Sequence, residues 1–187
     1  ASSIIREHLE AVTHCLHHLD RPDLAKPLLH IIDREADSVG HIRQWQHAGY
    51  RWLVRVKGNS RLTHQGQTTN SKTLAQQLPF KKVRKVTHQG KSQWQWLAET
   101  TVSLTRPAKP SRKKTPKVAV PGDPVEARLI ISRILADDGT LLAEWFLLSN
   151  VMGVDRSTLA LWYYWRWQIE SFFKLMKSAG HQLESWQ

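Results

Sequence analysis

Cysteine, long apolar runs and secretion signals are almost or entirely lacking in this sequence of 187 residues. The single cysteine, Cys15, excludes an internal disulfide and a cysteine-rich zinc site. No apolar run approaches the roughly 20 residues of a membrane-spanning helix, and no basic segment followed by an apolar core marks a secretion signal. These absences favour a protein of the reducing cytoplasm with no membrane partner.

Acidic residues are scarce in the middle of the chain. Residues 51–120 contain sixteen Lys or Arg and one acid, Glu99, while the remaining residues contain eleven bases and fifteen acids. The net charge of +11 is therefore concentrated in one cationic block between mildly acidic flanks. Such a block predicts a polyanionic partner, and nucleic acid is the leading candidate. An anionic membrane surface is a weaker alternative, because we find no basic amphipathic helix.

The hydrophobic pattern predicts an α/β core interrupted by a long antiparallel β subdomain. We expect helices at 2–19 and 37–48, a short helix or turn at 73–78, and strands at 28–32, 50–56, 92–104, 126–135 and 141–149. A proline-rich basic loop is expected at 105–124, and a last helix from residue 155, with Ser157 and Thr158 as candidate caps. We divide the chain into a first core segment (1–60), a basic β-rich insertion (61–150) and a closing helical region (151–187).

Four polar residues on the expected last helix stand out. Tyr163, Arg166, Glu170 and Lys177 stand at offsets of zero, three, seven and fourteen, which place them within roughly 60° of one another on an α-helix. A carboxylate can hold a divalent metal, and cationic and phenolic neighbours can hold phosphate. An exposed helix face, with Glu170 paired to Arg166 and Lys174, is the alternative. The surrounding segment is so aromatic that we expect much of this helix to be buried against protein or DNA.

Carboxylates also follow the first expected strand, in the segment Asp33-Arg-Glu-Ala-Asp37. A side chain at the carboxyl end of a strand projects into the crevice where α/β sheets bind their ligands. Asp33 is therefore a candidate metal ligand. Because Asp also commonly caps helices, we assign capping to Asp37, although the local sequence leaves the two roles exchangeable.

The two motifs together resemble those of the bacterial cut-and-paste insertion-sequence transposases of the Y-R-E-K type. A strand-borne Asp-Arg-Glu-Ala-Asp precedes Tyr-(x2)-Arg-(x3)-Glu-(x6)-Lys on a helix. The resemblance extends through Trp52-Leu-Val-Arg-Val-Lys57 and Glu144-Trp-Phe-Leu-Leu-Ser149 and covers nearly the whole chain. It implies a partial ribonuclease-H-like core with a β-rich insertion, and a DDE triad that uses two divalent cations, Mg²⁺ or Mn²⁺, to cut and rejoin DNA.

Carried over by position, the resemblance implies that Asp33 and Glu170 are catalytic carboxylates and metal ligands. The partners that it implies are double-stranded DNA, at transposon ends and target, and a second copy of the protein in a synaptic complex. Trp145 would stack on a base flipped out of the DNA, although ordinary strand packing is an equal alternative. The residues implied to contact DNA are Arg55, Lys57, Trp145, Tyr163, Arg166 and Lys177.

One carboxylate of the triad has no counterpart here. In the family the first Asp lies on an early strand, whereas Asp20 and Asp23 lie in an expected turn after a helix. Since the sequence also begins at Ala1 rather than Met, we expect a fragment that binds metal poorly and does not cleave DNA alone. Two alternatives stay open. A catalytically inactive DNA-binding protein with this fold fits the missing Asp, whereas an RNA-binding or ribosomal module explains only the charge.

Overall fold

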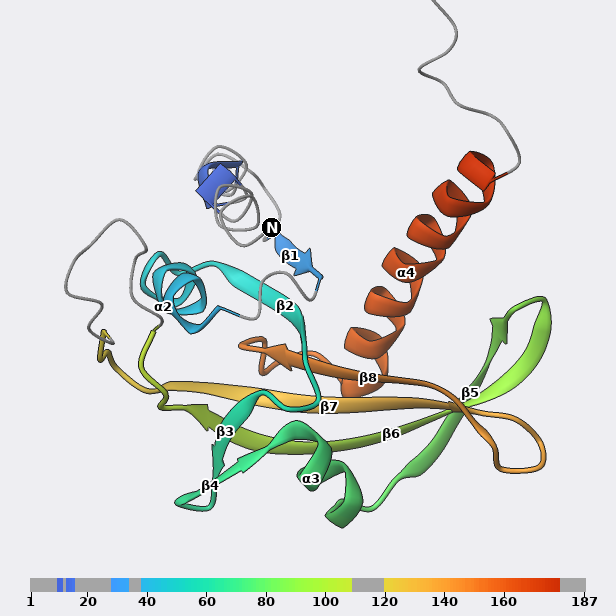
Figure 1. Ribbon diagram of the computed structural model, residues 1–187, viewed down its shortest axis with the longest axis horizontal. Helices are drawn as coiled ribbons and strands as arrows, with labels where there is room; N and C mark the ends of the chain where they lie inside the picture. Colours follow the sequence, from blue (N-terminus) through green and yellow to red (C-terminus); the bar gives the residue numbers. More distant parts are fainter. Residues whose placement is uncertain (1–9, 12, 16–27, 34–37, 109–119, 179–187) are drawn as a thin grey trace, which may run out of the picture.

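The computed structural model describes residues 10–11, 13–15, 28–33, 38–108 and 120–178, and its strands form one eight-stranded sheet (Figure 1). The strand order is β1-β2-β8-β7-β6-β3-β4, and β5 pairs with β6 beside this path. The strands are β1 (Leu29–Ile32), β2 (Arg51–Val56), β3 (Arg61–His64), β4 (Gln67–Asn70), β5 (Lys81–His88), β6 (Lys91–Leu104), β7 (Val125–Leu135) and β8 (Leu141–Ser149). The helices are α2 (Val39–His47), α3 (Ser71–Gln77) and α4 (Arg156–Ser178). This mixed α/β arrangement confirms the predicted fold class and is consistent with a partial ribonuclease-H-like core.

The strands β1 and β2 form a parallel pair that is connected through α2. The apolar side of α2, with Val39, Ile42 and Trp45, is buried as its helical spacing predicts. The cap of this helix differs from the prediction. Its N-cap residue is Ser38, whose hydroxyl contacts His41 rather than the helix backbone, and Asp37 lies outside the described residues.

The predicted β-rich insertion joins the same sheet. Strand β6 pairs with β7 and β7 pairs with β8, both antiparallel, and β8 also pairs antiparallel with β2. The insertion is therefore hydrogen-bonded directly to the first core segment, and the boundaries at residues 60 and 150 stay predictions. Three strands were not predicted, namely β3, β4 and β5. They are short or rich in polar residues, and each hairpin turns at a Gln-Gly pair with positive φ at both residues.

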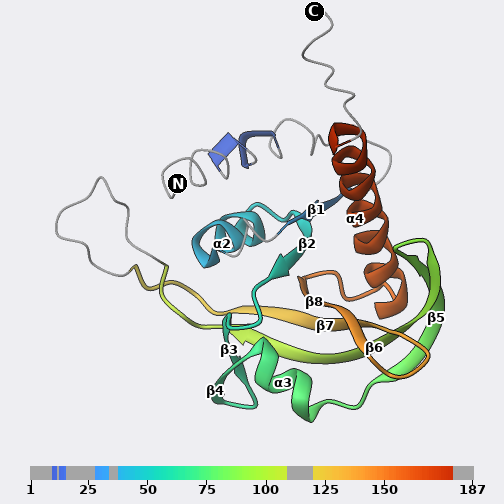
Figure 2. The ribbon, with the colours of Figure 1, turned by 45° about the vertical axis from the view of Figure 1, so that its right-hand side comes forward.

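Two hydrophobic clusters cover the two faces of the sheet. Figure 2 shows α3 and α4 on opposite sides of strands β6 and β7. The first cluster packs α2 and α3 against the strands, and the second packs the first half of α4. Strand β6 supplies both clusters alternately, since Ala98 and Val102 belong to the first and Leu97 belongs to the second. The side chains of the even-numbered residues of β6 therefore lie on the face of the sheet opposite to α4.

Helix α4 is buried only in its first half. Leu159, Ala160 and Tyr163 are fully buried, whereas five large apolar side chains further along are more than half exposed. These are Trp165, Ile169, Phe172, Phe173 and Leu175. Figure 1 shows this part of α4 extending beyond the sheet. The expectation that much of the aromatic segment is buried therefore holds only for the part of α4 that touches the sheet.

The N-terminus of α4 is capped two residues before Ser157, the first of the two predicted caps. Asp155, not Ser157 or Thr158, precedes the helix, and its carboxylate accepts a hydrogen bond of 2.7 Å from the backbone N–H of Ser157. The hydrogen bonds from the Ser157 hydroxyl and backbone lower the pKa of the Asp155 carboxyl below its ordinary value. A carboxylate is also favoured here by the positive end of the helix dipole.

Candidate active site

Asp33 and Arg55 meet because β1 and β2 are parallel and in register. Ile32 lies opposite Val54, so the next residues along the two strands, Asp33 and Arg55, also lie side by side. The Arg55 Nη1 atom is 3.5 Å from the Asp33 Oδ1 atom. Both side chains are about a quarter exposed. The carboxyl end of the parallel pair thus presents one acid and one guanidinium in a partly open position, as the sequence argument for Asp33 requires.

Tyr163 reaches the same carboxylate from α4. Its hydroxyl donates a hydrogen bond of 2.9 Å to the Asp33 Oδ1 atom, and its side chain is fully buried. Burial raises the pKa of the Tyr163 phenol far above its ordinary value, although the positive charge of Arg55 opposes this. Tyr163 is therefore a neutral hydrogen-bond donor at physiological pH and fixes the orientation of the Asp33 carboxylate.

Arg166 lies between the two candidate carboxylates. Its Nη1 atom is 3.7 Å from Asp33 Oδ2 and 2.5 Å from Glu170 Oε1. It makes these contacts as ion pairs, without the geometry of a directed hydrogen bond. The side chains of Arg166, Asp33 and Glu170 are 28%, 29% and 34% exposed, so all three can be reached from solvent. One cation therefore joins an acid from β1 to an acid from α4.

These residues form a cluster of two acids, two arginines and one tyrosine, which we name the Asp33 cluster. Its members are Asp33, Arg55, Tyr163, Arg166 and Glu170. The structure thus brings together five of the eight residues that the sequence singled out. Its two carboxylates are balanced by two guanidinium groups, so an added anion or cation must displace one of these internal partners.

Lys57 lies beside the cluster rather than in it. It lines a hollow with Arg55, Gly58, Glu144 and Phe146, at the point where the chain leaves β2. A Cβ atom at Gly58 would approach the Phe146 ring to 3.2 Å, so a glycine suits this close packing. The hollow therefore carries two cations, Arg55 of the cluster and Lys57, which lies two residues further along and just after the end of β2. Lys177 lies in α4, and its side chain is outside the described residues.

Trp145 is buried beneath α4. It is 4% exposed, and its ring centroid lies 5.7 Å from that of Tyr163 and 5.4 Å from that of Trp167. Aromatic packing of this kind stabilises the contact between β8 and the helix. In this conformation the ring is not available to an incoming base, so a stacking role requires a local opening of the α4–β8 contact.

A second set of contacts, which the sequence did not indicate, holds α4 in place. The end of β5 contacts one side of the helix. The backbone carbonyl of Thr87 accepts hydrogen bonds from Tyr164 and Gln168, and His88 stacks on Trp167 with ring centroids 5.4 Å apart. Tyr164, Trp167 and Gln168 share one helix face by their spacing of three and four. That spacing could have indicated a shared contact surface on the helix. The partners of these three residues, however, lie in β5, a strand that the sequence did not predict.

The described residues include no group of three or more His, Cys, Asp or Glu side chains positioned for a metal ion. Asp33 and Glu170 nevertheless fit part of a site for Mg²⁺ or Mn²⁺, since both offer hard oxygen ligands and both contact the same cationic group. They supply two carboxylates, and a complete site needs further ligands. No helix in the described part of the chain is long and apolar enough to cross a membrane.

Comparison with known proteins places the chain in a family. A family model described as Transposase DDE domain matches residues 6–186, which is nearly the whole chain. A search of curated proteins found no match. The match spans β1, the whole β-rich region and α4, and therefore includes every residue of the Asp33 cluster.

Proposed function

Because the chain belongs to the family of transposase DDE domains, we propose that the Asp33 cluster is part of an active site that cleaves and transfers DNA strands at transposon ends. The family makes the chain part of a DNA-transposition enzyme. The proposal that these residues form the active site rests on one observation. Asp33, near the start of the chain, and Glu170, near its end, both contact the guanidinium of Arg166. If Arg166 and Glu170 only formed an ion pair on an exposed helix face, the Asp33 carboxylate would not be expected to contact Arg166 as well.

In this proposal Asp33 and Glu170 are the catalytic carboxylates and hold divalent cations, Mg²⁺ or Mn²⁺. When bound, a pair of such ions activates the attacking oxygen and stabilises the leaving oxygen of an in-line displacement. Tyr163 keeps the Asp33 carboxylate oriented through its hydrogen bond. Because the phenol is buried and its pKa is raised, it keeps its proton while it does so.

A third carboxylate, the first Asp of the triad, is proposed to lie outside this chain. Among the described strands β1 pairs only with β2, so its other edge can accept a further parallel strand. The carboxyl end of such a strand would lie beside Asp33. With only two of its acids, the chain by itself would bind metal weakly and would not cleave DNA.

The cationic residues would change partners when the site is filled. In the Asp33 cluster Arg55 and Arg166 neutralise the two carboxylates. If divalent cations take over that neutralisation, the guanidinium groups become available for phosphates, which they bind in a bidentate geometry. We assign Arg55, Lys57, Arg166 and Lys177 to phosphate contacts near the transposon end, with Tyr163 as a neutral donor beside them.

Trp145 is proposed to stack on a base flipped out while the DNA end forms a hairpin. Stacking of a base on an aromatic ring contributes about 1–3 kcal/mol, which would offset part of the cost of opening its packing against Tyr163 and Trp167. We also propose that the protein acts in the cytoplasm as a homodimer that holds double-stranded DNA in a synaptic complex. We further propose that it is a transposase of the Y-R-E-K type. A catalytically inactive DNA-binding protein with the same fold is the alternative.

The test is cleavage of end DNA by the complete transposase with Glu170→Ala. We expect cleavage to be abolished while binding to end DNA is retained, because Glu170 would hold metal rather than DNA. Asp137→Asn is the matched control, since this carboxylate is exposed in the turn after β7 and should leave both properties unchanged. Cleavage that survives Glu170→Ala would remove the catalytic role and favour the alternative.

A further inference from the structure

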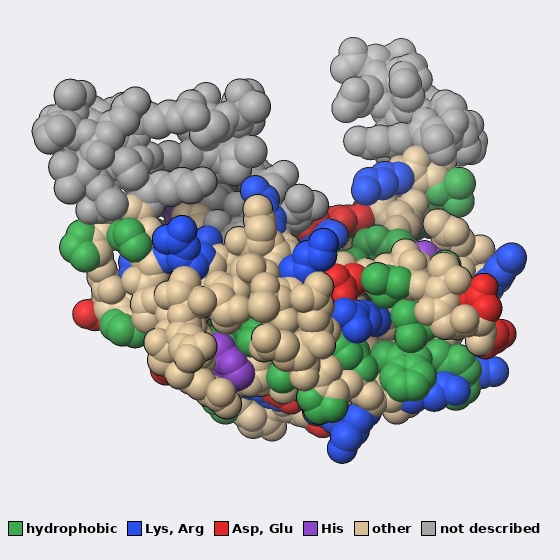
Figure 3. Space-filling model, turned by 60° about the horizontal axis from the view of Figure 1, so that its bottom comes forward, with side chains coloured by type: hydrophobic (Ala, Val, Ile, Leu, Met, Phe, Trp, Pro, Cys, Tyr) green, Lys and Arg blue, Asp and Glu red, His purple; other side chains and the backbone are tan. Residues whose placement is uncertain are grey.

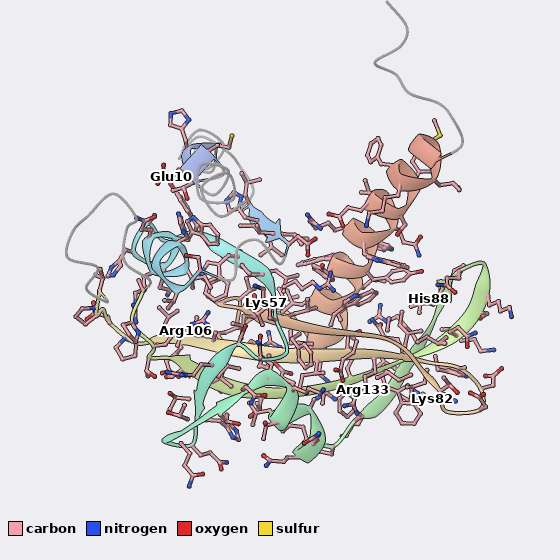
Figure 4. All side chains as sticks on the ribbon, viewed as in Figure 1. Glu10, Lys57, Lys82, His88, Arg106 and Arg133 are labelled. Carbon is pink, nitrogen blue, oxygen red and sulfur yellow. The ribbon has the colours of Figure 1, made fainter. Side chains whose placement is uncertain are left out.

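A row of cations and aromatic rings crosses the sheet on the face opposite to α4. The strand registers place Lys82 of β5 opposite Trp96 of β6, Trp96 opposite Arg133 of β7, and Arg133 opposite Glu144 of β8. In the next row Lys85 lies opposite Trp94. Figure 4 shows Lys82 and Arg133 on the side of the sheet away from α4. We name this set the Lys82 surface, with the members Lys82, Lys85, Trp94, Trp96 and Arg133.

Aromatic rings hold the cations of this surface. The Lys82 Nζ atom lies 3.6 Å from the centroid of the Trp94 ring, and the Lys85 Nζ atom lies 5.3 Å from the same ring. Arg133 lies over the Phe80 ring, 4.0 Å from its centroid. The lysines are exposed and the two tryptophans half-buried, so the ring faces are shared with solvent. In the space-filling view, Lys and Arg side chains border hydrophobic ones at this end of the sheet (Figure 3).

This arrangement is unusual for a surface that only stabilises the fold. Lys82 and Lys85 bring two like charges to one indole ring, and within the described residues neither forms an ion pair. A cation over an exposed ring contributes only about 0.5–1 kcal/mol, and repulsion between the two ammonium groups reduces that further. The nearest acid of the row, Glu144, is already paired with Arg133 at 2.7 Å. The surface therefore presents two oriented, uncompensated positive charges, which suits an anionic partner.

The partner that fits best is a phosphate backbone. Strands β5 and β6 together contain Lys81, Lys82, Arg84, Lys85 and Lys91 against the single acid Glu99, which is itself paired with Arg128. Oriented cations with interleaved aromatic rings are typical of surfaces that follow nucleic acid. The Asp33 cluster lies on the other side of the sheet, with α4. We propose that the Lys82 surface binds the backbone of a DNA segment other than the one held at the Asp33 cluster.

The test measures how DNA binding depends on salt. The chain is titrated with a short fluorescent duplex of arbitrary sequence, in EDTA, across about 50–200 mM salt. Each phosphate contact that is lost makes the slope of log K against log salt shallower by about 0.9. We expect Lys82→Gln/Lys85→Gln to weaken binding and to reduce the slope by about 1.8. The control Arg51→Gln/Arg61→Gln also removes two exposed cations, but far from this surface, and should leave the slope nearly unchanged.

Variants of Trp94 test whether the ring positions the lysines. Trp94→Ala keeps both charges but frees the ammonium groups, so we expect affinity to fall about two- to fivefold with an unchanged salt slope. Trp94→Phe retains a ring and should restore most of the affinity. If Trp94→Ala fails to fold, the lysine variants still test whether this surface binds DNA, since both lysines are exposed and their substitution should leave the fold intact. An unchanged affinity in folded Trp94→Ala would overturn the positioning by the ring.

Equal slopes for the two double variants would overturn the proposal, because the charge of this surface would then matter no more than charge elsewhere. Competition by polyglutamate as strong as that by DNA, at equal charge, would assign the surface to an acidic protein instead. The assay contains no metal and measures no cleavage. A failure here therefore leaves the roles of Asp33 and Glu170 untouched, and a loss of those roles leaves this result standing.

Discussion

The hydrogen bond between Tyr163 and Asp33 can be removed almost without other change. In Tyr163→Phe the ring keeps its volume and its edge-on packing against Trp145, so no cavity forms. What is lost is one hydroxyl that donates to a carboxylate at 2.9 Å. The variant therefore isolates one of the two contacts that α4 makes with Asp33, the other being the ion pair of Arg166.

The expected cost follows from the surroundings of Asp33. A hydrogen bond to a charged group contributes about 1.5–3 kcal/mol when its partner has no substitute. The Asp33 side chain is 29% exposed and keeps ion pairs with Arg55 and Arg166, so water and these cations compensate for part of the loss. We therefore expect Tyr163→Phe to lower the free energy of unfolding by about 1 kcal/mol.

Urea unfolding of a double-mutant cycle with Asp33→Ala measures this interaction separately from other effects of each substitution. The coupling free energy between Tyr163 and Asp33 should be about 1 kcal/mol. Tyr164→Phe is the matched control, because its hydroxyl donates to the Thr87 carbonyl and not to a carboxylate. Combined with Asp33→Ala, it should show no coupling. A coupling between Tyr163 and Asp33 below about 0.3 kcal/mol, the ordinary limit of additivity, would refute the contact.

Two further predictions concern the elements that hold α4. Asp155→Ala should lower the free energy of unfolding by about 1 kcal/mol, the typical value of an N-cap, whereas Thr158→Ala should change it less; urea unfolding that ranks them in the opposite order would contradict the cap. Burial lowers the pKa of His88 below its ordinary value of 6.5, so the unfolded chain binds more protons than the folded one. Stability should therefore fall as the pH drops from about 7 to 5, and thermal melts of His88→Gln should show a weaker pH dependence than those of the unchanged chain.

The parts of the fold that the sequence predicted are those with strong periodic patterns. The apolar run before Asp33, the amphipathic α2 and the paired strands β7 and β8 appear within a few residues of their expected limits. Strand β5 was missed because its register shifts between Lys82 and Arg84, which breaks the alternation of polar and apolar residues. The Gln-Gly turn at Gln89 and Gly90 was a usable signal for a hairpin.

The candidate site was predicted in its members but not in its connections. Helical spacing placed Tyr163, Arg166 and Glu170 on one face, and strand logic placed Asp33 at the end of β1. Neither argument could show that Arg166 contacts both carboxylates, because that depends on the angle at which α4 crosses the sheet. This angle is set by long-range contacts such as the Thr87 carbonyl with Tyr164, which no local pattern encodes.

If Asp33 and Glu170 are metal ligands, exchange of either carboxylate for a thiolate should change which divalent cation supports cleavage. A thiolate is a softer ligand that suits Mn²⁺ better than Mg²⁺. In the complete transposase, Asp33→Cys and Glu170→Cys should each abolish strand cleavage in Mg²⁺ and recover part of it in Mn²⁺. The control Asp137→Cys should cleave normally with either metal. Cleavage that persists in Mg²⁺, or a loss that Mn²⁺ does not relieve in either variant, would show that Asp33 and Glu170 do not hold the metal.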